Sequence, residues 1–124
     1  MTEKKKKILL VDDEPDICFT LKNGLEDYGF VVDAFENPQE SLQNFKADIY
    51  DLVILDIKMP QIDGFTLYEQ IRRRDRNVKV CFITASEEYY KEQFPELKKE
   101  ECFMQKPIPL DNLLERVNVV LGNL

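Results

Sequence analysis

The chain has 124 residues, about the length of one compact domain, which argues against a two-domain enzyme. With 44% apolar residues it can bury a core without disulfides or a structural metal, and its net charge of −7 opposes general attraction to nucleic acid. The sequence contains no histidine, which excludes Ser-His-Asp and Cys-His catalysis, histidine metal ligands and a phosphohistidine on the chain itself.

Strand and helix patterns alternate along the chain. Ile8–Val11 is a short apolar run, typical of a strand buried on both faces of a sheet. The helix that follows has Asp13 available as a cap, Pro15 in its first turn and Gly29 as its stop. The remaining pattern predicts four more strands, at Phe30–Phe35, Leu52–Leu55, Val78–Ile83 and Cys102–Met104, the last of them short. Four more helices alternate with them: one opened by Asn37-Pro38, one around Leu67 and Ile71, one at Glu87–Phe94 and a last one over Leu110–Leu121. Pro95 ends or kinks the helix at Glu87–Phe94.

Five strands that alternate with five helices predict a parallel sheet with helices on both faces, and ligands of such folds bind beyond the carboxyl ends of the strands. The residues at those ends are Asp12 and Asp13, Asp56, Thr84 and Lys106. Carboxylates gathered there repel one another by roughly 3 kcal/mol per pair at about 5 Å and an effective dielectric of about 20. We therefore expect a positive partner at this edge of the sheet.

The residue types at the strand ends favour one kind of chemistry. Oxygen ligands without histidine or thiolate favour a hard divalent cation, and a shallow site with few protein ligands suits Mg²⁺. A cation, a lysine and a hydroxyl around a carboxylate form a receptacle for a phosphoryl group, and an aspartate can be the nucleophile. Each residue alone has an ordinary explanation, because Asp13 can cap a helix, Asp56 can end a strand and Lys106 can be a surface lysine. Their shared position favours a common site.

These motifs together resemble the receiver domain of two-component response regulators, over essentially the whole chain. The acidic pair of that family matches Asp12-Asp13, its phosphoacceptor matches Asp56, its threonine followed by alanine matches Thr84-Ala85, and its lysine-proline pair matches Lys106-Pro107. The methionine, proline and glycine that follow the phosphoacceptor in the family match Met59, Pro60 and Gly64.

The resemblance implies both a fold and a function. The fold is α/β and flavodoxin-like, a doubly wound five-stranded parallel sheet of order 2-1-3-4-5 with five helices, the fourth short or irregular because of Pro95. The function is that of a chemotaxis-regulator-like phosphoacceptor, which takes a phosphoryl group from a sensor histidine kinase or a phosphotransfer protein onto Asp56. Such a protein is not an enzyme beyond catalysing its own phosphorylation and dephosphorylation. Without histidine, this chain can accept from a phosphohistidine but cannot supply one.

The resemblance also assigns roles to single residues. Mg²⁺ would be bound by Asp13, Asp56 and the backbone carbonyl of Lys58, with Asp12 acting partly through water. Lys106 and Thr84 would hold the phosphoryl oxygens.

Capture of the phosphoryl group would draw Thr84 inward and bias Phe103, with the change read out on the fourth helix, fifth strand and fifth helix. Phe103 stands where the family often has tyrosine, so an inward ring gains no hydroxyl hydrogen bond. The peptide bond before Pro107 is expected to be cis. Pro109 replaces the usual cap of the last helix.

Three cysteines, Cys18, Cys81 and Cys102, form no CxxC pair and indicate reduced thiols packed as small hydrophobes in a cytoplasmic protein. No apolar stretch reaches the length of a membrane span, and Lys4–Lys7 are followed by too short an apolar run for a signal peptide. No linker or repeat interrupts the chain, so we treat residues 1–124 as one receiver domain.

The expected partners are a kinase or phosphotransfer protein and an unknown downstream protein, without direct nucleic-acid binding or membrane insertion. The receiver would be a monomer or a weak phosphorylation-dependent dimer. No DNA-binding segment follows Leu124, so the chain is either a stand-alone receiver or part of a longer one.

Three alternatives use the same fold or chemistry. One is a receiver-like interaction module that works without phosphorylation. A flavodoxin-like electron carrier is opposed by Asp12-Asp13-Glu14, which would repel a flavin phosphate. A haloacid-dehalogenase-type phosphatase would have a second aspartate where Lys58 stands.

Overall fold

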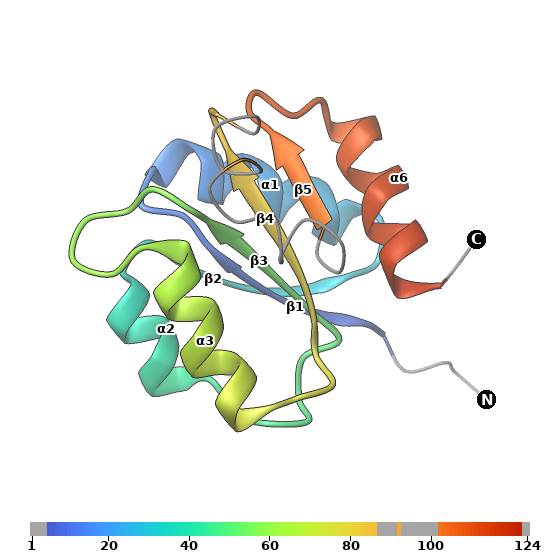
Figure 1. Cartoon of the computed structure of the whole chain (residues 1–124). Coiled ribbons are helices and arrows are strands. Elements are labelled where there is room, and N and C mark those ends of the chain that lie inside the picture. Colours follow the sequence, from blue (N-terminus) through green and yellow to red (C-terminus); the bar gives the residue numbers. More distant parts are fainter. Residues whose placement is uncertain (1–4, 87–91, 93–101, 123–124) are drawn as a thin grey trace.

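Five parallel strands form one sheet of order β2-β1-β3-β4-β5, as predicted (Figure 1). The computed structural model describes residues 5–86, 92 and 102–122. The observed strands agree with the predicted apolar runs to within a residue or so at each end: β1 (Lys7–Val11), β2 (Val31–Phe35), β3 (Leu52–Asp56), β4 (Lys79–Thr84) and β5 (Cys102–Gln105).

The described part of the chain contains four helices: α1 (Pro15–Asp27), α2 (Pro38–Asn44), α3 (Gly64–Arg74) and α6 (Leu110–Leu121). The fourth helix that the sequence predicts, at Glu87–Phe94, lies outside the described residues except for residue 92. Among the helices described, none is long and apolar enough to cross a membrane.

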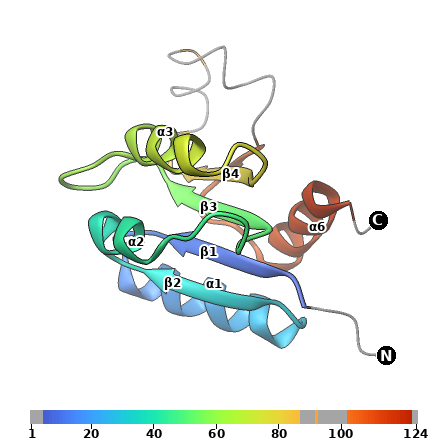
Figure 2. The same ribbon diagram turned by 90° about the horizontal axis from the view of Figure 1, so that it is seen from below.

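Helices cover both faces of the sheet (Figure 2), because alternate residues of each strand point to opposite sides. On one face, α2 and α3 cover Leu9, Val53 and Phe82; on the other, α1 and α6 cover Leu10 and Ile54. The central strands β1 and β3 are apolar almost throughout and buried on both sides, as a parallel sheet inside two helical layers requires. The core therefore lies in two layers, one on each side of a sheet that carries the acidic residues at its carboxyl edge.

The helix starts agree only in part with the sequence predictions. Asn37 caps α2 by accepting hydrogen bonds from two backbone amides of its first turn, and Pro38 follows it as predicted. The prediction that Asp13 caps α1 is wrong, because Pro15 is the first helical residue and Glu14 is the N-cap, without a side-chain cap hydrogen bond. The last helix has no side-chain cap at Pro109, as the sequence indicates.

Asp75 joins two loops at the amino edge of the sheet. This buried carboxylate accepts hydrogen bonds from the backbone amides of Asp48, Asn77 and Val78, at 2.9, 3.0 and 3.1 Å. Burial opposes the charged form, but these amides lower the pKa of Asp75 below its ordinary value. The carboxylate thus holds the loop after α2 to the loop after α3.

We expect Asp75→Ala to lower the free energy of unfolding by about 1.5–3 kcal/mol, the range for hydrogen bonds to a charged group. Because the folded-state pKa of Asp75 is lowered, its contribution is present above the unfolded-state pKa of about 3.9 and is lost as the pH falls. Urea unfolding at pH 7 and pH 3 measures both effects. Asp27→Ala, at the exposed end of α1, is the control, and an equal loss in the two variants would contradict the account.

Candidate functional site

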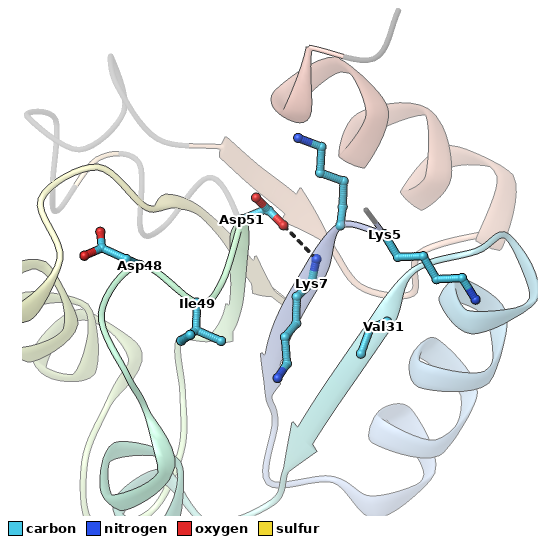
Figure 3. A pocket seen from close by; sticks show the side chains of 7 residues that line it. Lys5, Lys7, Val31, Asp48, Ile49 and Asp51 are labelled. Carbon is cyan, nitrogen blue, oxygen red and sulfur yellow. Dashed lines mark hydrogen bonds between the residues drawn. The ribbon is translucent and has the colours of Figure 1, made fainter. Parts of the chain in front are cut away.

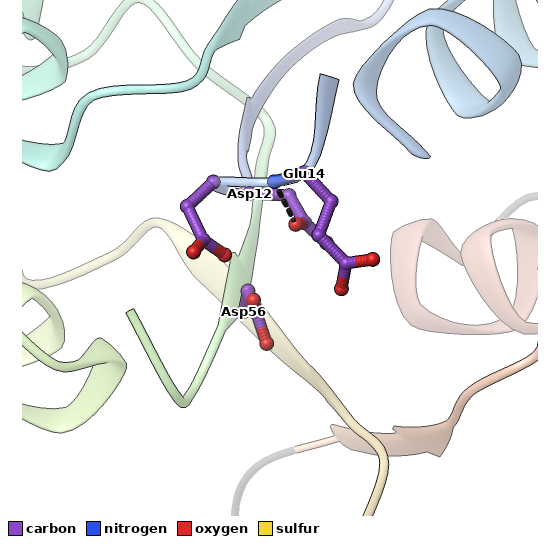
Figure 4. Close-up of side chains that lie close together, drawn as sticks. Asp12, Glu14 and Asp56 are labelled. Atoms are coloured by element: carbon purple, nitrogen blue, oxygen red, sulfur yellow. Dashed lines mark hydrogen bonds between the residues drawn. The ribbon is translucent and has the colours of Figure 1, made fainter. Parts of the chain in front are cut away.

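Four acidic residues gather at the carboxyl edge of the sheet (Figure 4). β1 and β3 are neighbours, and Val11 pairs with Leu55, so Asp12 and Asp56 come next at the same level. One carboxylate oxygen from each of the four acids lies within 4.8 Å of those of the other three: Asp12, Asp13, Glu14 and Asp56. The strand register, which the buried apolar runs determine, therefore brings together the three acids that the sequence singled out, Asp12, Asp13 and Asp56, and places Glu14 beside them.

Lys106 supplies the positive charge at this edge. Its Nζ lies 2.8 Å from Asp12 Oδ2, 3.1 Å from Glu14 Oε1 and 3.3 Å from Asp56 Oδ2. Its backbone N–H donates to the carbonyl of Thr84 at 2.8 Å, which holds the start of the loop after β5 against the end of β4. Asp12 Oδ2 is fully buried without a hydrogen bond of good geometry, so the ammonium of Lys106 is its nearest compensation.

Thr84 ends β4 and faces the same hollow as Asp56. Its Oγ1 accepts a hydrogen bond from the backbone N–H of Ser86 at 3.1 Å. The hollow has a volume of about 530 Å³ and is lined by Glu14, Asp56, Lys58, Thr84, Ala85, Ser86 and Lys106.

Phe103 lies beneath this edge, in the core. Its ring is buried and stacks obliquely against Phe82, with the ring centroids 5.2 Å apart. The aromatic residue that the resemblance singles out therefore points inward in this structure. The peptide bond between Lys106 and Pro107 is cis.

The ionisation of the site follows from burial and charge. Burial, followed by the negative charge of Asp12, raises the pKa of Asp56 to about 7. Burial also raises the pKa of Asp12. Burial alone would lower the pKa of Lys106, but Asp12, Glu14 and Asp56 raise it above its ordinary value, so the lysine stays charged. The four acids thus carry more negative charge than one lysine neutralises.

The donor set fits a hard divalent cation. All the side-chain ligand atoms are carboxylate oxygens, and the pKa of Asp56 is raised first by burial and then by the neighbouring charge of Asp12. The acids expected to contribute are Asp12, Asp13 and Asp56, and the carboxylate of Glu14 lies beside them in contact with Lys106.

A family model for the response regulator receiver domain matches residues 8–118. The chain belongs to this family. Members are signalling modules of two-component systems, and receivers are generally not enzymes for other substrates. The curated relatives include the transcriptional activator protein IrlR of Burkholderia pseudomallei, 34% identical over 93% of this chain and 50% of that protein. They also include the alkaline phosphatase synthesis transcriptional regulatory protein PhoP of Bacillus subtilis, 29% identical over 94% and 48%. The receiver thus spans about half the length of these relatives.

Solved receivers have the same fold. A CheY-like receiver domain protein from Methanospirillum hungatei superimposes with a TM-score of 0.86 at 26% identity, over 97% of this chain and 96% of that one. The response regulator TrrA of Thermotoga maritima, solved in complex with the histidine kinase ThkA, gives a TM-score of 0.80 at 37% identity, over 94% and 98%. TrrA has also been solved with Mg²⁺ and beryllofluoride.

Two contacts of this receiver's site were not evident from the sequence. The sequence indicates Glu14 only as a negative charge that would repel a flavin phosphate. Its ion pair with Lys106 joins residues 92 positions apart. Cys18 is a free thiol, as predicted, but it also donates to the carbonyl of Asp12 at 3.1 Å. Burial raises the pKa of Cys18 to about 11, so it remains a thiol and a donor.

A second hollow lies at the opposite, amino edge of the sheet (Figure 3). Lys7 lines this hollow and is held in two ways: its backbone N–H donates to Asp51, another lining residue, at 2.8 Å, and its Nζ lies 3.4 Å from Asp33 on the neighbouring strand β2. These two contacts help to fix the amino end of β1.

Gly64 lets α3 start directly against the backbone of β3. A Cβ at this position would lie 2.4 Å from the carbonyl oxygen of Asp56 and 2.8 Å from Ile57 Cα. We expect Gly64→Ala to destabilise the receiver by about 1–3 kcal/mol, the usual cost of overpacking against atoms that cannot move aside. Thermal unfolding measures this loss.

The control for Gly64→Ala is Gly24→Ala in α1. There the added Cβ would meet the flexible side chain of Leu110 instead of backbone, and alanine favours the helix. A loss in Gly24→Ala as large as in Gly64→Ala would contradict the explanation.

The raised pKa of Asp56 predicts that this residue destabilises the metal-free receiver at high pH. Because its folded-state pKa is above its unfolded value, the stability that Asp56 contributes is present at low pH and is lost as the pH rises through about 7. We expect Asp56→Asn to unfold at a higher temperature than the wild type at pH 8 in EDTA, with the difference shrinking at pH 5. Differential scanning calorimetry measures this, with the exposed Asp16→Asn as the control. A lower unfolding temperature for Asp56→Asn at pH 8 would contradict the assignment.

Proposed function

We propose that this receiver accepts a phosphoryl group on Asp56 from the phosphohistidine of a sensor histidine kinase or a phosphotransfer protein. The observation that carries the proposal is the convergence of Asp56, Lys106 and Thr84 on one hollow, with Lys106 Nζ 3.3 Å from the Asp56 carboxylate. A buried carboxylate with an open face, a fixed cation and a hydroxyl beside it is suited to in-line attack on phosphorus.

Each residue would have a distinct part in the transfer. A carboxylate oxygen of Asp56 forms the new bond to phosphorus as the bond to the histidine nitrogen breaks. Lys106, already charged beside Asp56, neutralises a phosphoryl oxygen. The hydroxyl of Thr84, which now accepts from Ser86, is free to donate its own proton to another phosphoryl oxygen.

We propose that Asp13, Asp56 and the backbone carbonyl of Lys58 hold Mg²⁺, with Asp12 contributing partly through water. When bound, the cation would neutralise charge on the transferred phosphoryl oxygens. Support comes from the oxygen-only donor set and from the burial of Asp56 beside the charge of Asp12, which together raise the pKa of Asp56.

The proposed switch links Thr84 to Phe103. Movement of the Thr84 hydroxyl toward the phosphoryl group would change the space beside β4, against which the Phe103 ring packs through Phe82. Because phenylalanine has no hydroxyl, the two positions of this ring would differ in packing alone. The readout would then be the surface of the segment between β4 and β5, of β5 itself and of α6.

The proposed partners follow from the receiver's role. We propose that residues 1–124 form one receiver domain, which acts by binding a protein target and does not contact nucleic acid itself. We also propose that it is a monomer or a weak phosphorylation-dependent dimer. The complex of TrrA with a histidine kinase supports a kinase as the donor, and the net charge of −7 opposes direct nucleic-acid binding.

The test is labelling by acetyl phosphate, a small phosphoryl donor. We expect the intact mass to rise by one phosphoryl group in the presence of Mg²⁺, with no labelling of Asp56→Asn or in EDTA, because Asp56 is the nucleophile. Asp16→Asn, which removes an exposed acid of the same type, is the matched control and should label like the wild type. Labelling that survives Asp56→Asn would overturn the assignment.

A further inference from the structure

Glu14 is tied to the site at both ends. It is the N-cap of α1, yet its side chain makes no cap hydrogen bond. Its backbone N–H donates to Asp12 Oδ1 at 2.9 Å, and its carboxylate Oε1 lies 3.1 Å from Lys106 Nζ (Figure 4 shows Glu14 beside Asp12 and Asp56). The position that usually stabilises a helix start is therefore used to contact the lysine of the site.

The ammonium of Lys106 is surrounded by carboxylates, and its hydrogen bond to Glu14 uses one of its donors. A lysine has three N–H donors, and three carboxylate oxygens lie within 3.3 Å of Nζ, one each from Asp12, Glu14 and Asp56. A phosphoryl oxygen that approaches Asp56 and binds Lys106 therefore competes with these three contacts.

Burial decides which contact is replaced. The side chain of Asp12 is 0% exposed, so separating it from Lys106 leaves a charge without water. The side chain of Asp56 is 5% exposed and keeps its charge until its oxygen bonds to phosphorus, so it too holds Lys106 while the phosphoryl group approaches. The side chain of Glu14 is 60% exposed, and its carboxylate regains water when it leaves. Glu14 is the partner that Lys106 can give up most readily.

We propose that Glu14 is a positioning residue, which occupies the Lys106 donor that a phosphoryl oxygen takes and thereby restrains phosphorylation of Asp56. The inference rests on the proposed function and deepens it. In the unmodified receiver Glu14 holds Lys106, and as the phosphoryl group approaches Asp56 it is released to solvent at the rim of the hollow that it lines.

The test compares rate constants for phosphorylation by acetyl phosphate at saturating Mg²⁺, measured by intact mass. We expect Glu14→Gln to react about two- to fivefold faster than the wild type, the range set by an exposed ion pair. Asp16→Asn removes an exposed acid two residues further on, and its rate should stay near that of the wild type.

Glu14→Asp separates the contact from the charge. It keeps the negative charge but shortens the side chain by one methylene, which withdraws the carboxylate from Lys106. We expect it to react faster than the wild type as well. A wild-type rate for Glu14→Asp together with a faster Glu14→Gln would mean that only general repulsion acts, and would overturn the proposal.

Mg²⁺ binding provides a readout that does not depend on phosphorylation. We expect isothermal titration to give Glu14→Gln and Asp16→Asn the same dissociation constant for Mg²⁺. Weaker binding by Glu14→Gln alone would make Glu14 a cation ligand and overturn the proposal.

The two proposals fail differently. A wild type that acetyl phosphate labels, with Glu14→Gln no faster than Asp16→Asn, overturns the inference about Glu14 alone. A wild type that is never labelled overturns the proposed function, and this inference with it.

Discussion

The interaction on which the site depends is the contact of one ammonium, that of Lys106, with carboxylates at the carboxyl edge of the sheet. Asp12 and Asp56 are buried there because they directly follow or end strands that are themselves buried on both faces. Without Lys106 their charges would be uncompensated in a region of low dielectric, and even with it the pKa of Asp56 is raised to about 7. The same shortage of positive charge that costs stability makes the site suited to a cation and a phosphoryl group.

The fold brings these groups together by backbone contacts distant in the sequence. Parallel pairing of β1 with β3 sets Asp12 beside Asp56, and the Lys106 amide bonded to the Thr84 carbonyl sets the loop after β5 beside β4. Gly64 brings the start of α3 against the backbone of Asp56. This arrangement agrees with membership of the receiver family. In such a parallel sheet the functional groups lie where the strands end.

Sequence reasoning reached the parts that local pattern controls. The apolar runs at Ile8–Val11 and Leu52–Leu55 predicted the central strands, and Asn37-Pro38 predicted the start of α2, because burial and capping leave marks on adjacent residues. It missed Glu14 as the N-cap of α1 and as the partner of Lys106, since that choice depends on a residue 92 positions away. The contact of Asp75 with Asp48, 27 positions away, was missed for the same reason: nothing near Asp75 in the sequence indicates which loop it meets.

The most direct test of the central claim is to follow the backbone amide signals of the receiver by NMR as Mg²⁺ and beryllofluoride, a mimic of the phosphoryl group, are added. The account predicts that the signals of Asp56, Thr84 and Lys106 shift together in the wild type, because beryllofluoride bound to the Asp56 carboxylate is then contacted by Lys106 and Thr84. In Asp56→Asn, which lacks that carboxylate, the three signals should not shift together. Signals of Thr84 and Lys106 that stay in place in the wild type, or shift equally in Asp56→Asn, would contradict it.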